Sequence, residues 1–412
     1  MMFLSNFSLP ISHFSQYLTS LFSPLTSDVR MTVYFDNAAT TPLDPEVLEA
    51  MLPFLQNHFG NPSSIHGHGR QVRAAIENAR KTIAHLINAA PAEIVFTSCG
   101  TEADNYAAFG SVRTLGLKHM VSSRLVHHAV LHTTQALEKS GEAQLSYLRH
   151  DEQGRLDLAH LEELLATRPR TFVSLMQANN EIGNLNDIAA IGDICAHHNA
   201  VFHTDTVQTV GHYRHDVQQL KTHFLVGSAH KFHGPKGIGF LYRRSGQAMD
   251  ALIHGGSQER NQRAGTENVY GIVGMAKALE VAYRDMADHQ RHIQSLKDRF
   301  IQKLQVEIEG VEFNGTSAET ENSLYTVLSV SLPPSSMNEM LLFNLDINRI
   351  SVSGGSACTS GAQAGSHVLS ALNCNPDRGT IRFSMSKYNA AEEVDYAVEQ
   401  LAKMYRREPL KV

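Results

Sequence analysis

Helix-forming and strand-forming segments alternate along this chain from about residue 44, and this alternation constrains the fold more than any other feature. Residues 70–88 have the apolar spacing of an amphipathic helix, and 93–97 follow as a short apolar strand. The other expected strands are 119–122, 144–148, 171–176, 200–203, 222–226 and 239–242, and expected helices include 158–166 and 188–198. The pattern predicts an α/β fold, with a mostly parallel sheet flanked by helices.

A chain of 412 residues is long enough for two domains. A polar, glycine-rich loop at 254–266 precedes a long amphipathic stretch at 267–304, which we interpret as a helix linking a large domain to a small C-terminal α+β domain. The small domain is expected to contain strands near 326–332 and 380–383 and a last helix near 391–405. We expect 44–287 to form the large domain. Residues 31–43 and 288–412 would form the small domain, which carries Cys358.

The first 30 residues differ from the rest of the chain. They are rich in Ser, Phe and Leu, and Asp28 and Arg30 are their only charged residues. They lack the basic start and unbroken apolar core of a secretory signal, and the several arginines of a mitochondrial transit peptide. We expect residues 1–30 to be a disordered extension or an artefact of start-codon choice, which the intact mass of the natively expressed protein would decide.

Composition excludes several functional classes. A formal net charge of −6 argues against binding nucleic acid through bulk charge. No apolar run approaches the length of a transmembrane helix, so no membrane partner is expected. Four widely spaced cysteines form neither a disulfide framework nor a zinc pattern, which favours a reduced, cytoplasmic protein. The 23 histidines include adjacent pairs without a third or fourth ligand at a recognisable spacing, so we expect no metal site.

Two neighbouring strands are expected to end in a carboxylate and an amine. Residues 201–208 carry an apolar run into Asp205, and the apolar residues 224–227 lead through Ser-Ala-His into Lys231. Both side chains would lie at the edge where open α/β sheets bind ligands. Such a pair suits pyridoxal phosphate (PLP), because Lys holds the aldehyde as a Schiff base and Asp keeps the pyridinium nitrogen protonated. The simpler interpretations are a solvated loop lysine and a strand-end cap.

A phosphate site is expected beside this pair. Gly100 and Thr101 stand between a strand and a helix, where backbone N–H groups at a helix N-terminus attract anions. Ser228 and His230, next to the lysine, could donate to the same phosphate. Simple N-capping by Thr101 is the alternative.

Three further side chains could contact the cofactor ring or the substrate. Gln208 follows the aspartate by three residues and could reach the phenolic oxygen of PLP. Asn179 follows another apolar strand and faces the same edge, although turn formation would also explain it. His127 opens a helix and could stack on the ring face, although a histidine there can also serve as a cap.

Cys358 lies in Ser-Gly-Gly-Ser-Ala-Cys-Thr-Ser-Gly, residues 353–361. A cysteine among small polar residues is expected on a mobile, exposed loop, where its thiol can act as a nucleophile. With an unperturbed pKa of about 8.5, such a thiol has some thiolate at neutral pH. The alternative is a flexible linker with an incidental cysteine.

Arg382 lies inside the strand-like segment 380–384. A buried arginine needs a carboxylate partner. An amino-acid substrate would supply one, which the guanidinium could bind in a bidentate manner, so we expect Arg382 at the substrate site.

Together these residues resemble the cysteine desulfurases, in the class V aminotransferase branch of the fold type I PLP enzymes. The resemblance covers residues 33 to about 404, and its matching segments are 36–42, 60–64, 101–105, 179–183, 203–208, 228–239, 254–266 and 353–360. The Ser-Ala-Cys-Thr-Ser stretch around Cys358 is similar to the group I subclass, which has a long cysteine loop.

The resemblance implies a PLP-dependent homodimer that converts L-cysteine to L-alanine. It assigns the Schiff base and the α-proton base to Lys231, and stacking with assistance in proton transfer to His127. The other implied cofactor residues are Gly100, Thr101, Asp205, Gln208, Ser228 and His230, with Thr266 reaching the phosphate in the other subunit. Asn179 and Arg382 would anchor the substrate carboxylate. Cys358 would take the sulfur as a persulfide, pass it to an acceptor such as an iron–sulfur scaffold, and could ligate a nascent iron–sulfur cluster.

The chain departs from the family pattern at Val126, at Thr206-Val207 and at Asn261-Gln262, which affect packing more than chemistry. The short segment after Arg407 puts the usual scaffold partner in doubt. Two rival functions are a related PLP aminotransferase or lyase, which needs no thiol, and an inactive adaptor that only docks sulfur-trafficking partners.

Overall fold

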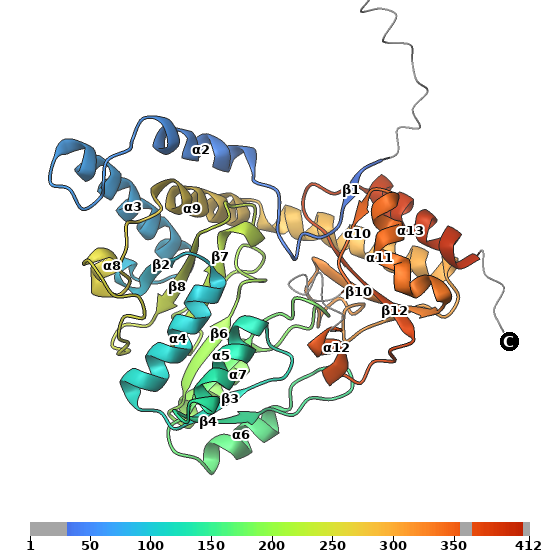
Figure 1. Ribbon diagram of the computed structural model, residues 1–412, viewed down its shortest axis with the longest axis horizontal. Coiled ribbons are helices and arrows are strands. Elements are labelled where there is room, and N and C mark those ends of the chain that lie inside the picture. The colour runs from blue at the N-terminus through green and yellow to red at the C-terminus, as the bar shows by residue number, and fades with distance from the viewer. Residues whose placement is uncertain (1–30, 355–364, 407–412) are drawn as a thin grey trace, which may run out of the picture.

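The computed structural model describes residues 31–354 and 365–406, so Cys358 and the first 30 residues lie outside the described part. The chain forms a larger and a smaller body side by side (Figure 1). Each body has its own cluster of buried apolar side chains. The domain boundaries expected from the sequence, at residues 44 and 287, stay a prediction.

Seven described strands form the sheet of the larger body. Their spatial order is β2 (Ile94–Thr97), β8 (Gly239–Arg243), β7 (Phe224–Ser228), β6 (Val201–Asp205), β5 (Phe172–Met176), β3 (His119–Ser122) and β4 (Gln144–Tyr147). Strand β8 runs antiparallel to both of its neighbours, and every other adjacent pair is parallel. The expected mostly parallel α/β sheet is confirmed, and β6 ends at Asp205 itself.

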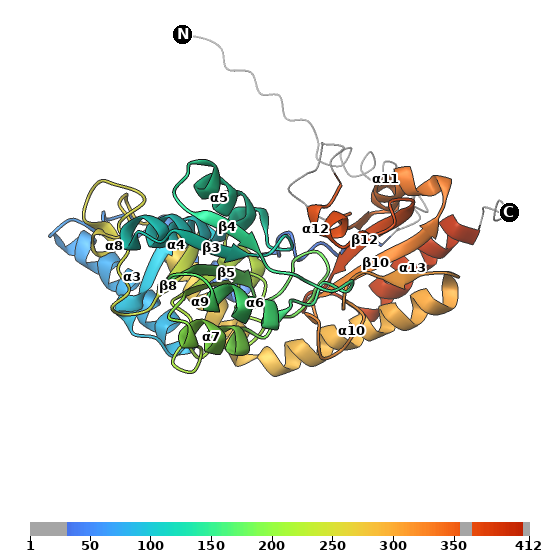
Figure 2. The same ribbon diagram turned by 90° about the horizontal axis from the view of Figure 1, so that it is seen from below.

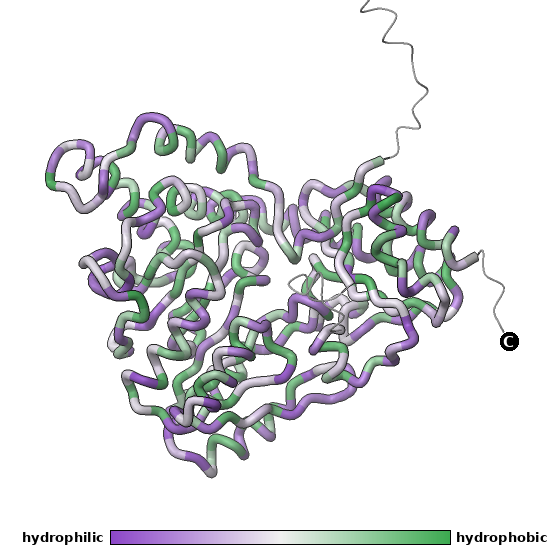
Figure 3. The backbone as a smooth tube through the Cα atoms, in the orientation of Figure 1, coloured by the Kyte–Doolittle hydropathy of each residue, from purple (hydrophilic) through white to green (hydrophobic). Residues whose placement is uncertain are grey.

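Helices cover both faces of this sheet, so the central strands β5, β6 and β7 are buried on both sides. One face carries α2 (Pro45–Gln56), α3 (Gly67–Leu86), α6 (Leu158–Ala166), α7 (Ile188–His197) and α9 (Val269–Arg284). The other face carries α4 (Gly100–Leu115) and α5 (His128–Lys139). Within β7, Leu225 packs toward α3 and α9, whereas Phe224 and Val226 pack toward α4. Figure 3 shows the mixture of hydrophobic and hydrophilic residues along the helices that cover the sheet.

The smaller body combines the two ends of the described chain. Its antiparallel strands are β9 (Glu312–Phe313), β10 (Val327–Pro334) and β12 (Arg378–Ser384), and β1 (Val33–Tyr34) pairs in parallel with β11 (Ile350–Ser351). Its helices are α10 (Met286–Glu307), α11 (Leu341–Ile347), α12 (His367–Ala371) and α13 (Ala391–Arg406). Figure 2 shows α10 running from the junction along this body. Phe35, Phe300 and Phe383 pack ring against ring in the core.

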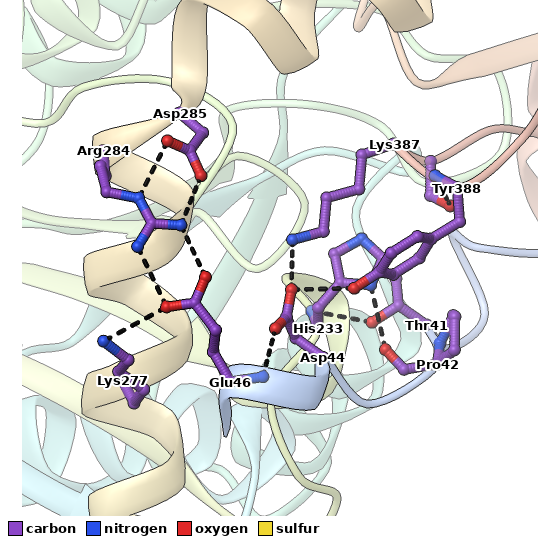
Figure 4. A network of polar contacts seen from close by, with 11 residues as sticks. Thr41, Pro42, Asp44, Glu46, His233, Lys277, Arg284, Asp285, Lys387 and Tyr388 are labelled. Atoms are coloured by element: carbon purple, nitrogen blue, oxygen red, sulfur yellow. Dashed lines mark hydrogen bonds and ion pairs between the residues drawn. The ribbon is translucent and has the colours of Figure 1, made fainter. Parts of the chain in front are cut away.

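The single helix expected over 267–304 is two helices. Asp285, with φ −106° and ψ 13°, separates α9 from α10. Its carboxylate accepts a hydrogen bond of 2.7 Å from Arg284, which also donates to Glu46 at 2.7 Å (Figure 4). The prediction was wrong because both helices are amphipathic, so the apolar periodicity continues across a one-residue break.

The segment between β1 and α2 joins the two bodies. Asp44 caps α2 by accepting a hydrogen bond from the Glu46 N–H, and it also binds Lys387 and Tyr388 of the smaller body (Figure 4). A buried carboxylate with three donors is costly to leave unpaired, so this junction favours one arrangement of the bodies.

Among the described helices, none has both the length and the apolar character needed to cross a lipid bilayer. Within residues 31–354 and 365–406, no three His, Cys, Asp or Glu side chains gather in a way that could hold a metal ion.

Candidate active site

A cavity of about 200 Å³ opens where β6 and β7 end and α4 begins. Nine of the residues predicted from the sequence line it: Gly100, Thr101, His127, Asp205, Gln208, Ser228, His230, Lys231 and Arg382. Ala38, Ala39, Cys99, Asp104, Met176, Asn180 and Val207 line it as well. The edge of the sheet therefore gathers side chains from segments that are distant in the sequence.

Lys231 lies in the short 3-10 turn Ala229–Lys231 that follows β7. Its Nζ donates hydrogen bonds to the carbonyl oxygens of Ala38 at 2.5 Å and Ala39 at 3.0 Å. Thr41 stabilises the same turn, because its hydroxyl donates a hydrogen bond of 2.9 Å to the His230 carbonyl oxygen. The segment before α2 thus holds the lysine inside the cavity.

Asp205 ends β6 and is buried. Its Oδ1 accepts a hydrogen bond of 2.9 Å from the Val207 N–H. Burial raises the pKa of this carboxyl above its usual value, while the Val207 bond and the positive charge of Lys231 act in the opposite direction. A cationic ring nitrogen placed here would compensate for the lost hydration of the carboxylate.

Another group of residues that line the cavity fits a phosphate. Ser228 Oγ is buried and has no hydrogen-bond partner among the described residues. His230 Nδ1 lies 3.2 Å from Thr40 Oγ1, and burial, followed by the charges of Lys231 and Lys236, lowers the pKa of its imidazole to about 4. At Gly100 a Cβ atom would come within 2.6 Å of Val207 Cγ2, so only glycine lets the helix start this close to the sheet. The first N–H groups of α4 and an unpaired buried hydroxyl are donors that a phosphate can use.

His127 is the N-cap of α5, and its Nδ1 accepts a hydrogen bond of 3.1 Å from the Ala129 N–H. Burial, and then the charges of Lys231, His367 and His132, lower the pKa of the imidazole to about 4. The ring is therefore a neutral, flat group at the cavity wall. His127 is thus a helix cap through Nδ1, and this contact leaves the face of its ring available to a ligand.

Arg382 is almost wholly buried, and two groups of the protein accept hydrogen bonds from its guanidinium. Its Nη2 donates to Asp36 Oδ1 at 2.8 Å and its Nη1 donates to the Asn180 carbonyl at 2.9 Å. Asp36 therefore supplies the carboxylate partner that a buried arginine needs, and binding of a substrate carboxylate by Arg382 stays a prediction. Nε is buried and has no hydrogen-bond partner in the described chain.

Asn179 lies at the expected sheet edge, but its amide serves the turn that follows β5. Nδ2 donates to the Leu125 carbonyl at 2.7 Å, and Oδ1 accepts from the N–H groups of Glu181 and Ile182. Its neighbour Asn180 is the residue that lines the cavity.

Thr266 does not reach this cavity in its own chain. It lines a separate hollow of about 120 Å³ together with Glu259 and Arg263. Its expected role in the other subunit's site stays a prediction, as does the role of Cys358, which lies outside the described residues.

Comparison with known proteins fits this geometry. Residues 33–397 match the family model described as aminotransferase class-V. A cysteine desulfurase IscS from Dictyoglomus turgidum is 44% identical over 92% of this chain and 96% of its own length. This chain belongs to the cysteine desulfurase family. A putative cysteine desulfurase IscS 1 from Bacillus subtilis is 42% identical over 91% of this chain and 99% of its own. A solved structure titled NIFS-like protein superimposes with a TM-score of 0.84 at 36% identity, covering 91% of this chain and 99% of that one.

Sequence reasoning missed several residues of this desulfurase-family cavity. Ala38 and Ala39 contribute backbone carbonyl groups, which leave no signature in side-chain chemistry. Asp36 is recognisable as a site residue only once its contact with Arg382 is known. Asp104 could have been found, because it lies three residues after Thr101 on an expected helix and so shares its face.

Buried histidines make the stability of this family member sensitive to acid. Burial lowers the pKa of several imidazoles to about 3 or 4, among them those of His127, His203, His212, His215, His230 and His233. The unfolded chain takes up these protons near pH 6.5 and the folded chain does not, so stability is complete above about pH 6.5 and falls toward about pH 4. Each histidine contributes up to about 1.4 kcal/mol per pH unit, partly offset by the raised pKa values of Asp104 and Asp205.

We therefore expect the urea midpoint of the cofactor-free protein to drop clearly between about pH 7.5 and about pH 5.5. Equilibrium unfolding followed by circular dichroism measures this change. A midpoint that stays constant or rises over this interval would show that the histidines are not kept neutral.

Proposed function

We propose that this chain removes sulfur from L-cysteine with PLP as cofactor, releases L-alanine and holds the sulfur as a persulfide on Cys358. The observation that carries the proposal is the convergence of Lys231 and Asp205 on one cavity beside a buried, unpaired serine hydroxyl. Overall, L-cysteine and one enzyme thiol give L-alanine and one enzyme persulfide, so sulfur moves to the protein without an added oxidant.

Different residues of the cavity would hold different parts of PLP. Lys231 would hold the aldehyde carbon and Asp205 the ring nitrogen, with Gln208 at the phenolic oxygen and His127 against the ring face. The phosphate would be held by Gly100, Thr101, Ser228 and His230. When bound, PLP supplies an electron sink for the carbanion that forms on the substrate.

The chain's own groups do the remaining work. Lys231 Nζ is the base for the substrate α-proton, and the low pKa of His127 leaves a neutral imidazole that can assist proton transfer. The free Nε of Arg382 points to carboxylate recognition, with Asp36 and the Asn180 carbonyl fixing the guanidinium plane. The bonds of Asn179 shape the turn that presents Asn180 beside this arginine, so we propose that Asn179 supports carboxylate binding.

We further propose that the chain works as a homodimer, in which Thr266 completes the phosphate site of the other subunit. Apolar side chains are exposed on and after α2, namely Leu48, Leu52, Leu55, Phe59 and Ile65, and the last two are 80% and 89% exposed. Burying such a surface against a second copy is favourable. The sulfur acceptor is proposed to be an iron–sulfur scaffold protein, and the wide spacing of the cysteines favours a cytoplasmic location.

Sulfide and alanine release from L-cysteine, with a thiol reductant present, tests the function directly. We expect a yellow protein that forms both products in equal amounts. A colourless protein that does not take up added PLP would refute the cofactor assignment. A yellow protein that forms pyruvate and ammonia with the sulfide, and no alanine, would favour a lyase, and one that forms 3-mercaptopyruvate without sulfide would favour an aminotransferase.

Replacing Arg382 with lysine is expected to raise KM for L-cysteine about tenfold with a smaller change in kcat, because a point charge replaces a planar donor array. Steady-state kinetics on the variant measure this split. Arg378→Lys, in the same strand but bound to Ser331 and the Gly310 carbonyl, is the matched control. Equal effects in both variants would contradict a role of Arg382 in substrate binding.

A further inference from the structure

Two buried ionisable side chains lie directly behind Asp205 and have no role in the mechanism above. Asp104 stands on α4 one turn after Thr101 and lines the cavity, and it is 2% exposed. His203 stands on β6 two residues before Asp205 and is fully buried. Asp104 Oδ1 and His203 Nε2 are 3.3 Å apart, and neither atom has another hydrogen-bond partner in the part of the chain that the structure describes.

The orientation of His203 is fixed from two sides. Its Nδ1 lies 2.8 Å from Ser174 Oγ on the neighbouring strand β5. Its ring stacks on Phe172, with centroids 6.0 Å apart and planes at 13°. Alternate residues of a strand share a face, so His203 and Asp205 both face α4. The imidazole is therefore positioned so that Nε2 has Asp104 as its partner.

Charges around the pair decide where its proton resides. Burial, and then the negative charge of Asp205, raise the pKa of Asp104 well above its usual value. Burial lowers the pKa of His203 to about 3, so the imidazole is neutral. An ionised Asp104 would bury a second negative charge beside Asp205 without a cation to match it. A protonated Asp104 instead donates to the free Nε2 of a neutral His203.

We propose that Asp104 and His203 are positioning residues for Asp205: Asp104 stays protonated and donates to His203 Nε2, so that the ring-nitrogen end of the cavity carries a single negative charge, on Asp205. The consequence for the cofactor rests on the function proposed above. The protonation of Asp104 is a property of the protein itself and can be measured without turnover.

Infrared difference spectroscopy tests the protonation state. The carbonyl stretch of a protonated carboxylic acid is expected at pH 7 in the wild type, both with and without PLP, and should be absent from Asp104→Asn. Spectra of the two proteins that coincide in this region would overturn the proposal. Because the cofactor-free protein is included, failure to bind PLP would refute the proposed function without affecting this measurement.

PLP affinity in matched variants tests the positioning role. Asp104→Asn keeps a neutral side chain that can donate to His203 Nε2, so its Kd for PLP is expected to stay within about threefold of the wild type. Asp104→Ala leaves Nε2 unpaired and is expected to weaken PLP binding about tenfold or more. Circular dichroism confirms that each variant is folded. If Asp104→Asn and Asp104→Ala bind PLP with the same affinity, whether weakened or unchanged, the proposal is contradicted. It is also contradicted if Asp104→Ala keeps the wild-type Kd while Asp104→Asn binds PLP more weakly.

Discussion

Lys231→Ala is expected to abolish covalent retention of PLP and to lower the rate of sulfide release by at least about 10³-fold. In the proposed function this lysine is both the covalent anchor and the base, and no other described lysine lines the cavity. Borohydride treatment followed by intact mass measurement checks the anchor. The wild type should gain the mass of one reduced cofactor, and the variant should gain none.

Lys221→Ala is the matched control, because this lysine pairs with Asp193 at the surface, outside the cavity. It should retain both the cofactor adduct and the rate of sulfide release. If the Lys231 variant still forms the adduct, another amine is the anchor. The position of Lys231 in the same cavity as Asp205 would then no longer support the proposed function.

Cys358→Ala is expected to remain yellow but to lose sulfide release by about 10³-fold or more, because the proposed nucleophile for the sulfur is gone. Incubation with ³⁵S-labelled L-cysteine, followed by separation without reductant, measures label on the protein. The wild type should carry label as a persulfide, and the variant should carry none. This result would also exclude an inactive adaptor, which forms no persulfide from free cysteine.

Cys374→Ser provides the control for this variant. The Cys374 thiol donates to Asn314 Oδ1 at 3.7 Å and lies outside the cavity, so its replacement should leave both label and sulfide release intact. Wild-type activity in the Cys358 variant would instead favour an aminotransferase or lyase, which needs no thiol.

The fold was predictable because its strands are short, apolar and separated by amphipathic helices, so each element is specified locally. Strand ends follow directly from such a pattern, which is why Asp205 and Lys231 were placed at one edge of the sheet. The break at Asp285 left no trace in the periodicity, since two amphipathic helices follow one another with a single residue between them.

Pairing between distant residues could not be predicted in the same way. The Asp36–Arg382 ion pair joins positions 346 residues apart, and only the folded chain shows that the arginine has its carboxylate already. Asn179 and Asn180 are adjacent in the sequence, and the geometry of their turn decides which one lines the cavity. The sequence therefore identifies candidate site residues by their chemistry, but only the long-range contacts of the fold show which of them line the cavity.

The segment from Asp36 to Asp44 ties the beginning of the chain to its end. Its neighbour β1 pairs with β11, and the Ala38 N–H donates to Ser384 Oγ, while the carbonyl of Ala38 accepts from Lys231. During synthesis on the ribosome, the partners of this early segment emerge only when residues near 384 have been translated. The lysine pocket is therefore complete only after nearly the whole polypeptide has left the exit tunnel, so binding of the proposed cofactor would come late in synthesis.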